Sequence, residues 1–212
     1  MMKIAAALGL AAFLAAACGA CPQRPPSFHS VTLVPIGAVP ELDGSVIAGL
    51  SRRFAGLRFE VAAAQPLTDA MLGQHRPQAF DIAVVEAMAP LGPGTIAVLA
   101  RDLTHTEMNF IFAHVELERG LGVVSVARFR TALGDPREMT DAPSGEVLQR
   151  SRRRLEIQLT GSVAKLIGLG MRCDNARCVL RYPNDLTAFD AKGPDFCPEH
   201  AEKLRKLLAA RR

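Results

Sequence analysis

The sequence has little net charge, no internal repeat and, beyond its first residues, no long hydrophobic run. Its 25 basic residues exceed its 21 acidic residues by four, which is too few to imply nucleic acid or another polyanionic partner. No later stretch has the roughly 20 apolar residues that a bilayer-spanning helix needs. With 212 residues, 49% of them hydrophobic, the chain can form one well-packed domain and leaves little room for two.

The basic residues are concentrated in two clusters, at residues 150–154 and 203–212. We interpret both clusters as solvated helix faces. Contact with an anionic membrane surface is the alternative, because the N-terminus resembles an export signal.

The N-terminal segment is typical of a secretion signal. Lys3 precedes an uncharged stretch rich in Ala and Leu at residues 4–17, which is too short to span a bilayer. Small residues lead directly into Cys18, as in a bacterial lipobox. We therefore expect residues 1–17 to be a lipoprotein-type signal peptide and Cys18 to be lipidated. Ordinary cleavage near Ala17 and an uncleaved anchor are the alternatives.

The proline-containing residues 18–29 are expected to form a tether, and residues 30–212 a single domain. This organisation predicts an exported protein of the bacterial cell envelope, anchored to a membrane through lipidated Cys18 and facing the periplasm. Gly19 after the cysteine favours the outer membrane.

Short apolar runs alternate with helical patterns in the first half of the domain. Strands are predicted at residues 31–36, 57–62, 80–85 and 94–99, and helices at 46–54 and 67–72. This alternation indicates an α/β sandwich. Residues 109–116 and 121–126 are expected to pair as a hairpin across Arg119 and Gly120. Residues 146–168 are predicted to form one long helix, because apolar residues recur at spacings of three, four and seven.

Three cysteines and a histidine near the C-terminus have the spacing of a zinc site. Cys173 and Cys178 are followed by Cys197 and His200, which makes two closely spaced pairs of soft or borderline ligands. Three thiolates and one imidazole would close all four positions of a tetrahedral zinc ion, so the site would be structural. A disulfide with one cysteine left over is the alternative in an oxidising compartment, followed by unliganded thiols.

Residues 178–200, CVLRYPNDLTAFDAKGPDFCPEH, closely resemble the C-terminal signature of archaemetzincins, small zinc-dependent peptidases of the metzincin group. Ten residues fall where the family pattern has them: Tyr182, Asn184, Leu186, Asp190, Lys192, Gly193, Pro194, Phe196, Cys197 and Pro198. The segments LVPIGAVP (33–40), MNFIFA (108–113) and VVSVARF (123–129) also resemble family text in the same order. The resemblance implies a compact metzincin-like α/β sandwich, with a mixed twisted sheet, an edge strand above a long active-site helix and a zinc-stapled C-terminal segment.

The family's catalytic residues have no counterpart in this chain. The family pattern is HExxHxxGxxxC, then CxM, then a closing CxxC. We align Gly168 with the family glycine. The first zinc ligand then falls on Gly161, the catalytic glutamate on Ser162 and the second ligand on Lys165. The third ligand falls on Met171, and none of the four residues is suited to its role. No histidine lies between His114 and His200, so no shift of the alignment restores the motif. Leu180 replaces the methionine of the Met-turn, and His200 replaces the last cysteine, an exchange that zinc tolerates.

These losses predict a catalytically inactive protein with one structural Zn²⁺ and no catalytic Zn²⁺. A metzincin needs zinc to lower the pKa of a bound water and a glutamate to take the proton. Gly161 offers no ligand, Ser162 is a poor base, and a charged Lys165 repels a metal. The Lys165 ammonium either occupies part of the vacated metal space beside a carboxylate or points to solvent.

A groove that binds a peptide or a protein tail could survive the loss of the metal. In the family the substrate lies extended along the edge strand, here expected at residues 109–114 and including Asn109, Phe110, Ile111 and Phe112, and main-chain hydrogen bonds hold it. An active zinc peptidase with unconventional ligands is the second hypothesis. The third is a structural envelope lipoprotein without a ligand.

Two other arrangements are weaker. A metal site at His105 and His114 would need an acidic ligand such as Glu107 or Glu116, and alternation along a strand sets many of these groups on different faces. Ser162 and Lys165 have the spacing of a Ser–Lys nucleophile pair, but no oxyanion hole accompanies them.

Overall fold

The computed structural model describes residues 26–72, 77–106 and 108–211, so the predicted signal peptide, Cys18 and most of the predicted tether lie outside the described residues. The strands are β1 (Ser30–Ile36), β2 (Arg58–Val61), β3 (Ala79–Phe80), β4 (Thr95–Leu99), β5 (Leu103–His105), β6 (Met108–Ile111), β7 (Ala113–Glu116) and β8 (Leu121–Ser125). The α-helices are α1 (Gly44–Arg53), α2 (Asp69–Leu72), α3 (Asp81–Met88), α4 (Gly145–Leu166), α5 (Leu186–Ala191) and α6 (Pro198–Ala209). Short 3₁₀ helices lie at Ala89–Leu91, Arg128–Arg130 and Pro136–Glu138.

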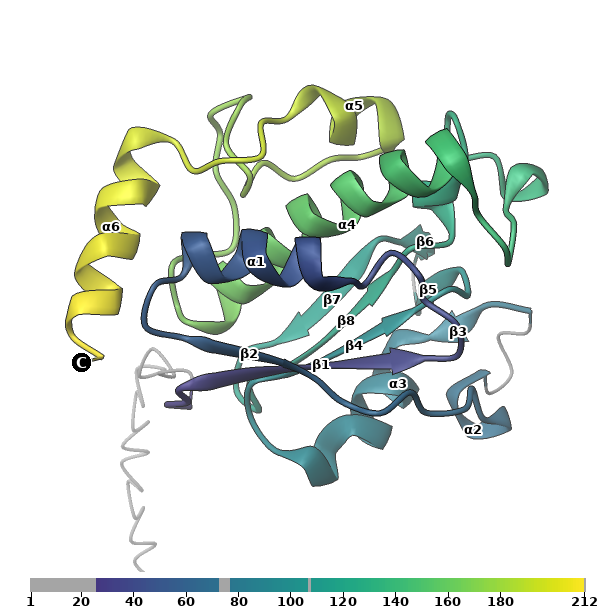
Figure 1. The fold of residues 1–212 in the computed structure, drawn as a ribbon, viewed down its shortest axis with the longest axis horizontal. Coiled ribbons are helices and arrows are strands. Elements are labelled where there is room, and N and C mark those ends of the chain that lie inside the picture. Colours follow the sequence, from purple (N-terminus) through teal and green to yellow (C-terminus); the bar gives the residue numbers. More distant parts are fainter. Residues whose placement is uncertain (1–25, 73–76, 107, 212) are drawn as a thin grey trace, which may run out of the picture.

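A mixed five-stranded sheet is the centre of the fold (Figure 1). Its strand order is β2-β1-β4-β8-β7, with four parallel strands and β7 antiparallel to β8. β4 and β8 are buried at every position, as is usual for central parallel strands covered on both faces. A smaller sheet has the order β3-β5-β6. The predicted α/β sandwich with a mixed sheet is confirmed.

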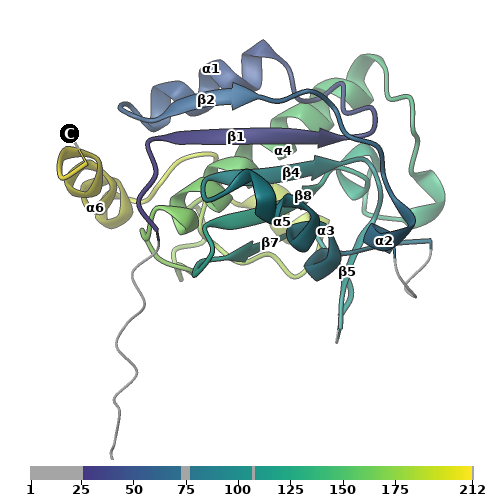
Figure 2. The same ribbon diagram turned by 90° about the horizontal axis from the view of Figure 1, so that it is seen from below.

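Helices cover both faces of the large sheet. In Figure 1, α1 and α4 lie above it and α2 and α3 below it, and Figure 2 gives the view from below. The upper layer encloses one apolar core, which includes Leu33, Leu50 and Leu159. The lower layer encloses a second, which includes Val34, Val85 and Leu99. Alternate residues of β1 thus enter opposite cores, as the two-residue period of a strand requires.

The predicted helix after the first strand is confirmed as α1. Asp43 caps it, since its Oδ1 atom accepts hydrogen bonds from the backbone N–H groups of Ser45 (2.9 Å) and Val46 (3.4 Å). Val46 and Leu50 are buried on the face toward the sheet. The piece predicted at residues 67–72 forms the single-turn helix α2.

The long helix is confirmed as α4, with bounds within two residues of the prediction. It ends before Gly168, whose φ of 87° lies in the left-handed region that glycine tolerates. The interpretation of residues 150–154 as a solvated face is wrong for Arg154, which is buried. Its guanidinium donates to Asp190 and to the carbonyl oxygens of Phe129 and Thr131.

The C-terminal basic cluster lies partly on the exposed face of α6, as expected. Lys203 and Arg205 are solvated and pair with Glu199 and Glu202 on the same helix. Among the residues that the structure describes, no helix has the length and apolar character needed to cross a membrane.

The strand predicted at residues 80–85 is wrong. Only Ala79–Phe80 are extended, and the chain then forms α3. Asp81, Val84, Val85 and Met88 are buried, at the spacing of zero, three, four and seven that marks one face of a helix. The run FDIAVV is too short to distinguish the two structures, and the pattern becomes helical only when Met88 is included.

The predicted hairpin is correct only in its second half. Ala113–Glu116 pairs with Leu121–Ser125 as expected, and β7 is the edge strand of the large sheet. Met108–Ile111 instead forms β6, which pairs with β5 in the small sheet. Phe112 lies between the two strands, so the predicted edge strand is divided between two sheets.

Candidate functional site

Cys173, Cys178, Cys197 and His200 converge in the structure, and we call them the Cys3His cluster. Their ligand atoms all lie within 4.8 Å of one another. The Sγ atoms of Cys173 and Cys197 are 3.8 Å apart, and the Cys197 Sγ lies 3.2 Å from the His200 Nδ1. Thiolates bound to tetrahedral zinc at about 2.3 Å are separated by about 3.8 Å, whereas a disulfide requires about 2.05 Å. The three cysteines are free, so these residues fit zinc rather than a disulfide.

Two of the four ligands are positioned by the start of α6. Cys197 is its N-cap, and His200 lies in its first turn. Hydrogen bonds from the backbone N–H and the imidazole of His200 lower the pKa of Cys197 to about 7. Burial raises the pKa of Cys173 to about 11, so a metal must displace its proton.

Backbone hydrogen bonds join the loop of Cys178 to the segment that carries Cys197. The N–H of Val179 donates to Asp195 O at 2.9 Å, and the N–H of Gly193 donates to Arg177 O at 2.9 Å. A Cβ atom at Gly193 would lie 2.4 Å from that same carbonyl oxygen, so only glycine permits the close approach. The cluster is therefore held by local structure on both sides.

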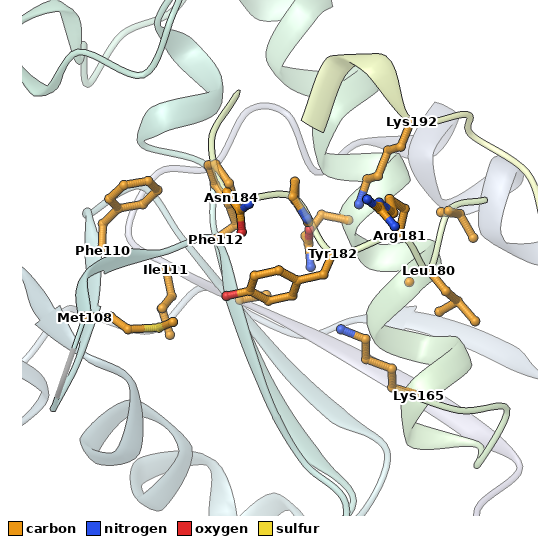
Figure 3. A pocket seen from close by; sticks show the side chains of 15 residues that line it. Met108, Phe110, Ile111, Phe112, Lys165, Leu180, Arg181, Tyr182, Asn184 and Lys192 are labelled. Atoms are coloured by element: carbon orange, nitrogen blue, oxygen red, sulfur yellow. The ribbon is translucent and has the colours of Figure 1, made fainter. Parts of the chain in front are cut away.

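A cavity of about 220 Å³ lies between α4, the β6–β7 segment and residues 179–184, and we call it the lysine pocket (Figure 3). Its apolar wall comes from Met108, Phe110, Ile111, Phe112, Ala113, Val179, Leu180, Tyr182 and Pro183. Its polar and remaining lining comes from Gln158, Gly161, Lys165, Arg181, Asn184 and Lys192. Three of these side chains are cationic, and none is a carboxylate.

The positions that hold the family's catalytic residues are only partly brought together. Gly161 and Lys165 line the lysine pocket, and Leu180 lies in its wall. Ser162 is fully buried within α4, where its Oγ lies 3.4 Å from the Gln158 amide nitrogen that donates to it. Met171 is 47% exposed and does not line the pocket.

Lys165 occupies the cavity beside Gly161, in line with one expectation, but it lacks the carboxylate partner that this expectation included. In Figure 3 its ammonium group is directed into the cavity, not to solvent. Burial and the charge of Arg172 lower its pKa. Within the described part of the chain, the side chain has no carboxylate partner at ion-pair distance. The residues at the family's catalytic positions thus do not fit a zinc ion.

A second lysine enters the pocket from the end of α5. Lys192 is only 6% exposed, and its Nζ lies 4.2 Å from the centroid of the Phe189 ring. Burial, followed by the charge of Lys165, lowers its pKa to about 7. Lys192 stands within the matched family signature, but no function was predicted for it, because no sequence pattern indicates that it shares a cavity with Lys165.

The predicted peptide-binding residues have two different environments. Phe110, Ile111 and Phe112 line the lysine pocket, whereas Asn109 does not. The backbone oxygen of Asn109 accepts a hydrogen bond from the Gln78 side chain at 2.8 Å. The Phe110 and Phe112 rings meet edge to face at 5.4 Å, so the pocket wall is a packed aromatic surface.

No protein-family model matches this sequence. The archaemetzincin of Thermococcus kodakarensis is 27% identical over 188 residues, which cover 84% of this chain and 96% of that protein. The archaemetzincin of Pyrobaculum aerophilum is 30% identical over 126 residues, which cover 59% of this chain and 70% of that protein.

Among solved structures, the archaemetzincin of Archaeoglobus fulgidus in complex with malonate superposes with a TM-score of 0.63 at 20% identity. The match covers 82% of this chain and 99% of that protein, so the metzincin-like fold implied by the sequence is confirmed. The relatives named here are archaeal. Sequence and fold agree, and this chain belongs to the archaemetzincin family of zinc metallopeptidases.

Proposed function

We propose that this protein is a catalytically inactive archaemetzincin whose lysine pocket binds the carboxylate end of a peptide or protein tail. The observation that carries the proposal is Lys165, a cation at the second zinc-ligand position and directed into the pocket. Among the described residues, the groups of three or more potential metal ligands are the Cys3His cluster and one group that includes no pocket-lining residue.

The chemistry of hydrolysis supports inactivity. A catalytic zinc in this family polarises the scissile carbonyl and supplies a bound hydroxide near neutral pH. Gly161 has no ligand atom, and the buried Ser162 is no general base near neutral pH. The ammonium group of Lys165 disfavours a second cation in the same cavity.

The electrostatics of the pocket support an anionic ligand. Lys192 is a buried amine without a carboxylate partner at ion-pair distance among the described residues, and Lys165 raises the cost of its charge. A carboxylate between the two ammonium groups would offset that repulsion and form charge-assisted hydrogen bonds. The A. fulgidus protein of the same fold was crystallised in complex with malonate, a dicarboxylate.

The size and shape of the pocket limit what enters it. At about 220 Å³ it is smaller than typical sites for drug-sized ligands, so it suits one terminal residue better than a long peptide. The rings of Phe110 and Phe112 favour an apolar side chain on that residue. The preceding residues of the ligand would lie toward Ala113 at the start of the edge strand β7.

We assign one structural zinc to the Cys3His cluster. Cys178 is adjacent in sequence to Val179 and Leu180, which line the lysine pocket. Zinc would therefore fix the wall of the pocket as well as the start of α6. A zinc ion in the Cys3His cluster would therefore still be needed to shape the pocket in a chain that lacks the catalytic residues.

Binding of fluorescent peptides, measured by anisotropy, tests the proposal. Peptides with an apolar last residue and a free C-terminal carboxylate should bind, and the same peptides with an amidated end should not. Lys192→Met should weaken binding at least tenfold, which corresponds to about 1.4 kcal/mol. Lys206→Gln, at an exposed position on α6, is the matched control and should bind as the parent does. Equal binding of the two peptide forms, or chelator-sensitive cleavage of either, would overturn the proposal.

We further propose that the protein is exported and held at the bacterial envelope by lipidated Cys18. The support is the sequence of residues 1–18, with its basic start, apolar stretch and small residues before the cysteine. Mass spectrometry of the mature N-terminus provides the test. A diacylglyceryl-modified Cys18 is the expected species, whereas a free N-terminus at another residue would contradict lipidation.

A further inference from the structure

A second group of potential metal ligands includes no residue that lines the lysine pocket. Asp81 is the first residue of α3, His105 ends β5, and His114 is the second residue of β7. Their ligand atoms lie within 4.8 Å of one another. We propose that Asp81, His105 and His114 bind a divalent transition-metal ion.

The topology explains how residues so far apart in sequence meet. β3 pairs with β5 in parallel, with Phe80 opposite Thr104, so the next residues, Asp81 and His105, lie side by side. His114 points away from α4, because its neighbours Ala113 and Val115 pack into the core on that face. One helix and one strand from each of the two sheets therefore contribute one residue each.

The geometry suits a metal. The Nδ1 atoms of His105 and His114 lie 2.8 Å and 3.2 Å from the same atom, Oδ2 of Asp81. Ligands bonded at about 2.0–2.2 Å to one metal lie roughly 2.8–3.6 Å apart, depending on the coordination geometry. Both nitrogen–oxygen distances fall in this range, so the side chains need not move to bind an ion. The imidazole rings are stacked at 5.8 Å with an angle of 15°, so both present the same edge to the carboxylate.

The carboxylate itself is the second, independent observation. Asp81 is completely buried, and its Oδ1 atom has no hydrogen-bond partner within the described residues. Leaving a buried carboxylate oxygen without a donor is costly. Both imidazoles contact Oδ2, so neither of them satisfies Oδ1. A cation would compensate the buried charge, with Oδ1 as a further ligand or as the acceptor for a metal-bound water.

The ligand types define the class of ion. Two imidazoles and one carboxylate favour Zn²⁺, Fe²⁺, Co²⁺ or Ni²⁺ over Mg²⁺ and Ca²⁺, which prefer oxygen ligands. The two imidazole side chains are about one third exposed, at 34% and 32%, so an ion can enter and water can complete its coordination. The bound ion would join α3 to the β5–β6 hairpin, which forms part of the lysine pocket.

Metal titration of the full chain with Co²⁺ tests the assignment. Cys18→Ser and Cys21→Ser are included in every protein, so that the N-terminal thiols contribute nothing. The chain should bind two equivalents. The first should give intense thiolate charge-transfer bands from the Cys3His cluster, and the second only weak bands of nitrogen and oxygen ligands. Further replacement by His105→Gln with His114→Gln should abolish the second equivalent and leave the first unchanged. His29→Gln, at an exposed histidine, is the control and should retain both.

A second measurement uses the protein with His105 and His114 intact, so that misfolding of a variant cannot affect the result. Diethyl pyrocarbonate modifies exposed imidazoles, and mass spectrometry locates the products. The second equivalent of metal should protect His105 and His114 and leave His29 reactive. A single equivalent with thiolate bands only, and no protection of the two histidines, would show a hydrogen-bonded cluster without metal and overturn the proposal.

Discussion

The Cys3His cluster and the lysine pocket are joined by the short segment at residues 178–180. They differ in whether the residues needed to bind zinc are present. The cluster has four potential ligand atoms within 4.8 Å of one another. The pocket has no zinc-ligand set and contains Lys165 at the family's second ligand position, with Lys192 lining the same cavity. A structural metal and a catalytic metal are therefore separable, because the first positions a segment and the second must also activate water.

Loss of a cluster ligand should have the largest effect. Cys178→Ser removes a fully buried thiolate and should release zinc, which unfolds the segment that carries α6. We expect the Tm to fall by about 10 °C or more, since each kcal/mol of lost stability lowers it by roughly 2–4 °C in a chain of this size. Thermal unfolding followed by circular dichroism measures this. Chelated parent protein should match the variant, and an unchanged Tm in both would contradict a structural zinc.

Removal of the buried charge in the pocket should have an intermediate effect of opposite sign. The pKa of Lys192 is lowered to about 7 in the fold, below its ordinary value of 10.5. Between these values the unfolded chain binds more protons, so stability should rise with pH from about 7 to about 10.5. Lys192→Met should raise the free energy of unfolding by about 1–4 kcal/mol at pH 6 and change it least at pH 10.

Urea unfolding at both pH values measures this difference. Lys206→Gln, at an exposed lysine, is the control and should show no such pH-dependent gain. A Lys192→Met variant that is less stable than the parent at pH 6 would indicate that the amine has a carboxylate partner in the native state. The same protonation should contribute to binding, so carboxylate affinity should fall above pH 7 in the parent and depend less on pH in the variant.

Restoration of ligands to the pocket should have the smallest effect. Gly161→His with Lys165→His places two imidazoles at i and i+4 on α4, and the nearest atom to a new Cβ at Gly161 is Val179 O at an ordinary 3.5 Å. We expect weak binding of one additional Zn²⁺ and no peptidase activity, since Met171 lies outside the pocket and Ser162 remains. Metal titration and a peptide assay measure the two outcomes. Chelator-sensitive cleavage would show that a third ligand and a base are already present.

Much of the fold was readable because its signals are local and strong. The apolar spacing at residues 146–168 identified α4, and the two ligand pairs identified the Cys3His cluster. The run FDIAVV was misread because strand and helix bury the same apolar residues in so short a stretch. Because residues 80–85 were predicted to be a strand, the cluster of Asp81 with His105 and His114 was not predicted. In the structure Asp81 begins α3, and its Oδ2 atom lies near both imidazoles.

The lysine pocket could not be predicted from spacing. Lys192 follows α5 and Lys165 belongs to α4, and only the tertiary fold brings both to one cavity. The division of the expected edge strand had a similar cause. The chain passes from β6 to β7 at Phe112, and the partner strands, not the local sequence, decide which sheet each half joins.

The most direct test of the central claim is anomalous diffraction at the zinc edge from crystals of the zinc-loaded protein. The account predicts a strong peak enclosed by Cys173, Cys178, Cys197 and His200, and no peak in the lysine pocket between Gly161 and Lys165. A zinc peak in that pocket, together with chelator-sensitive peptide cleavage by the same preparation, would contradict it.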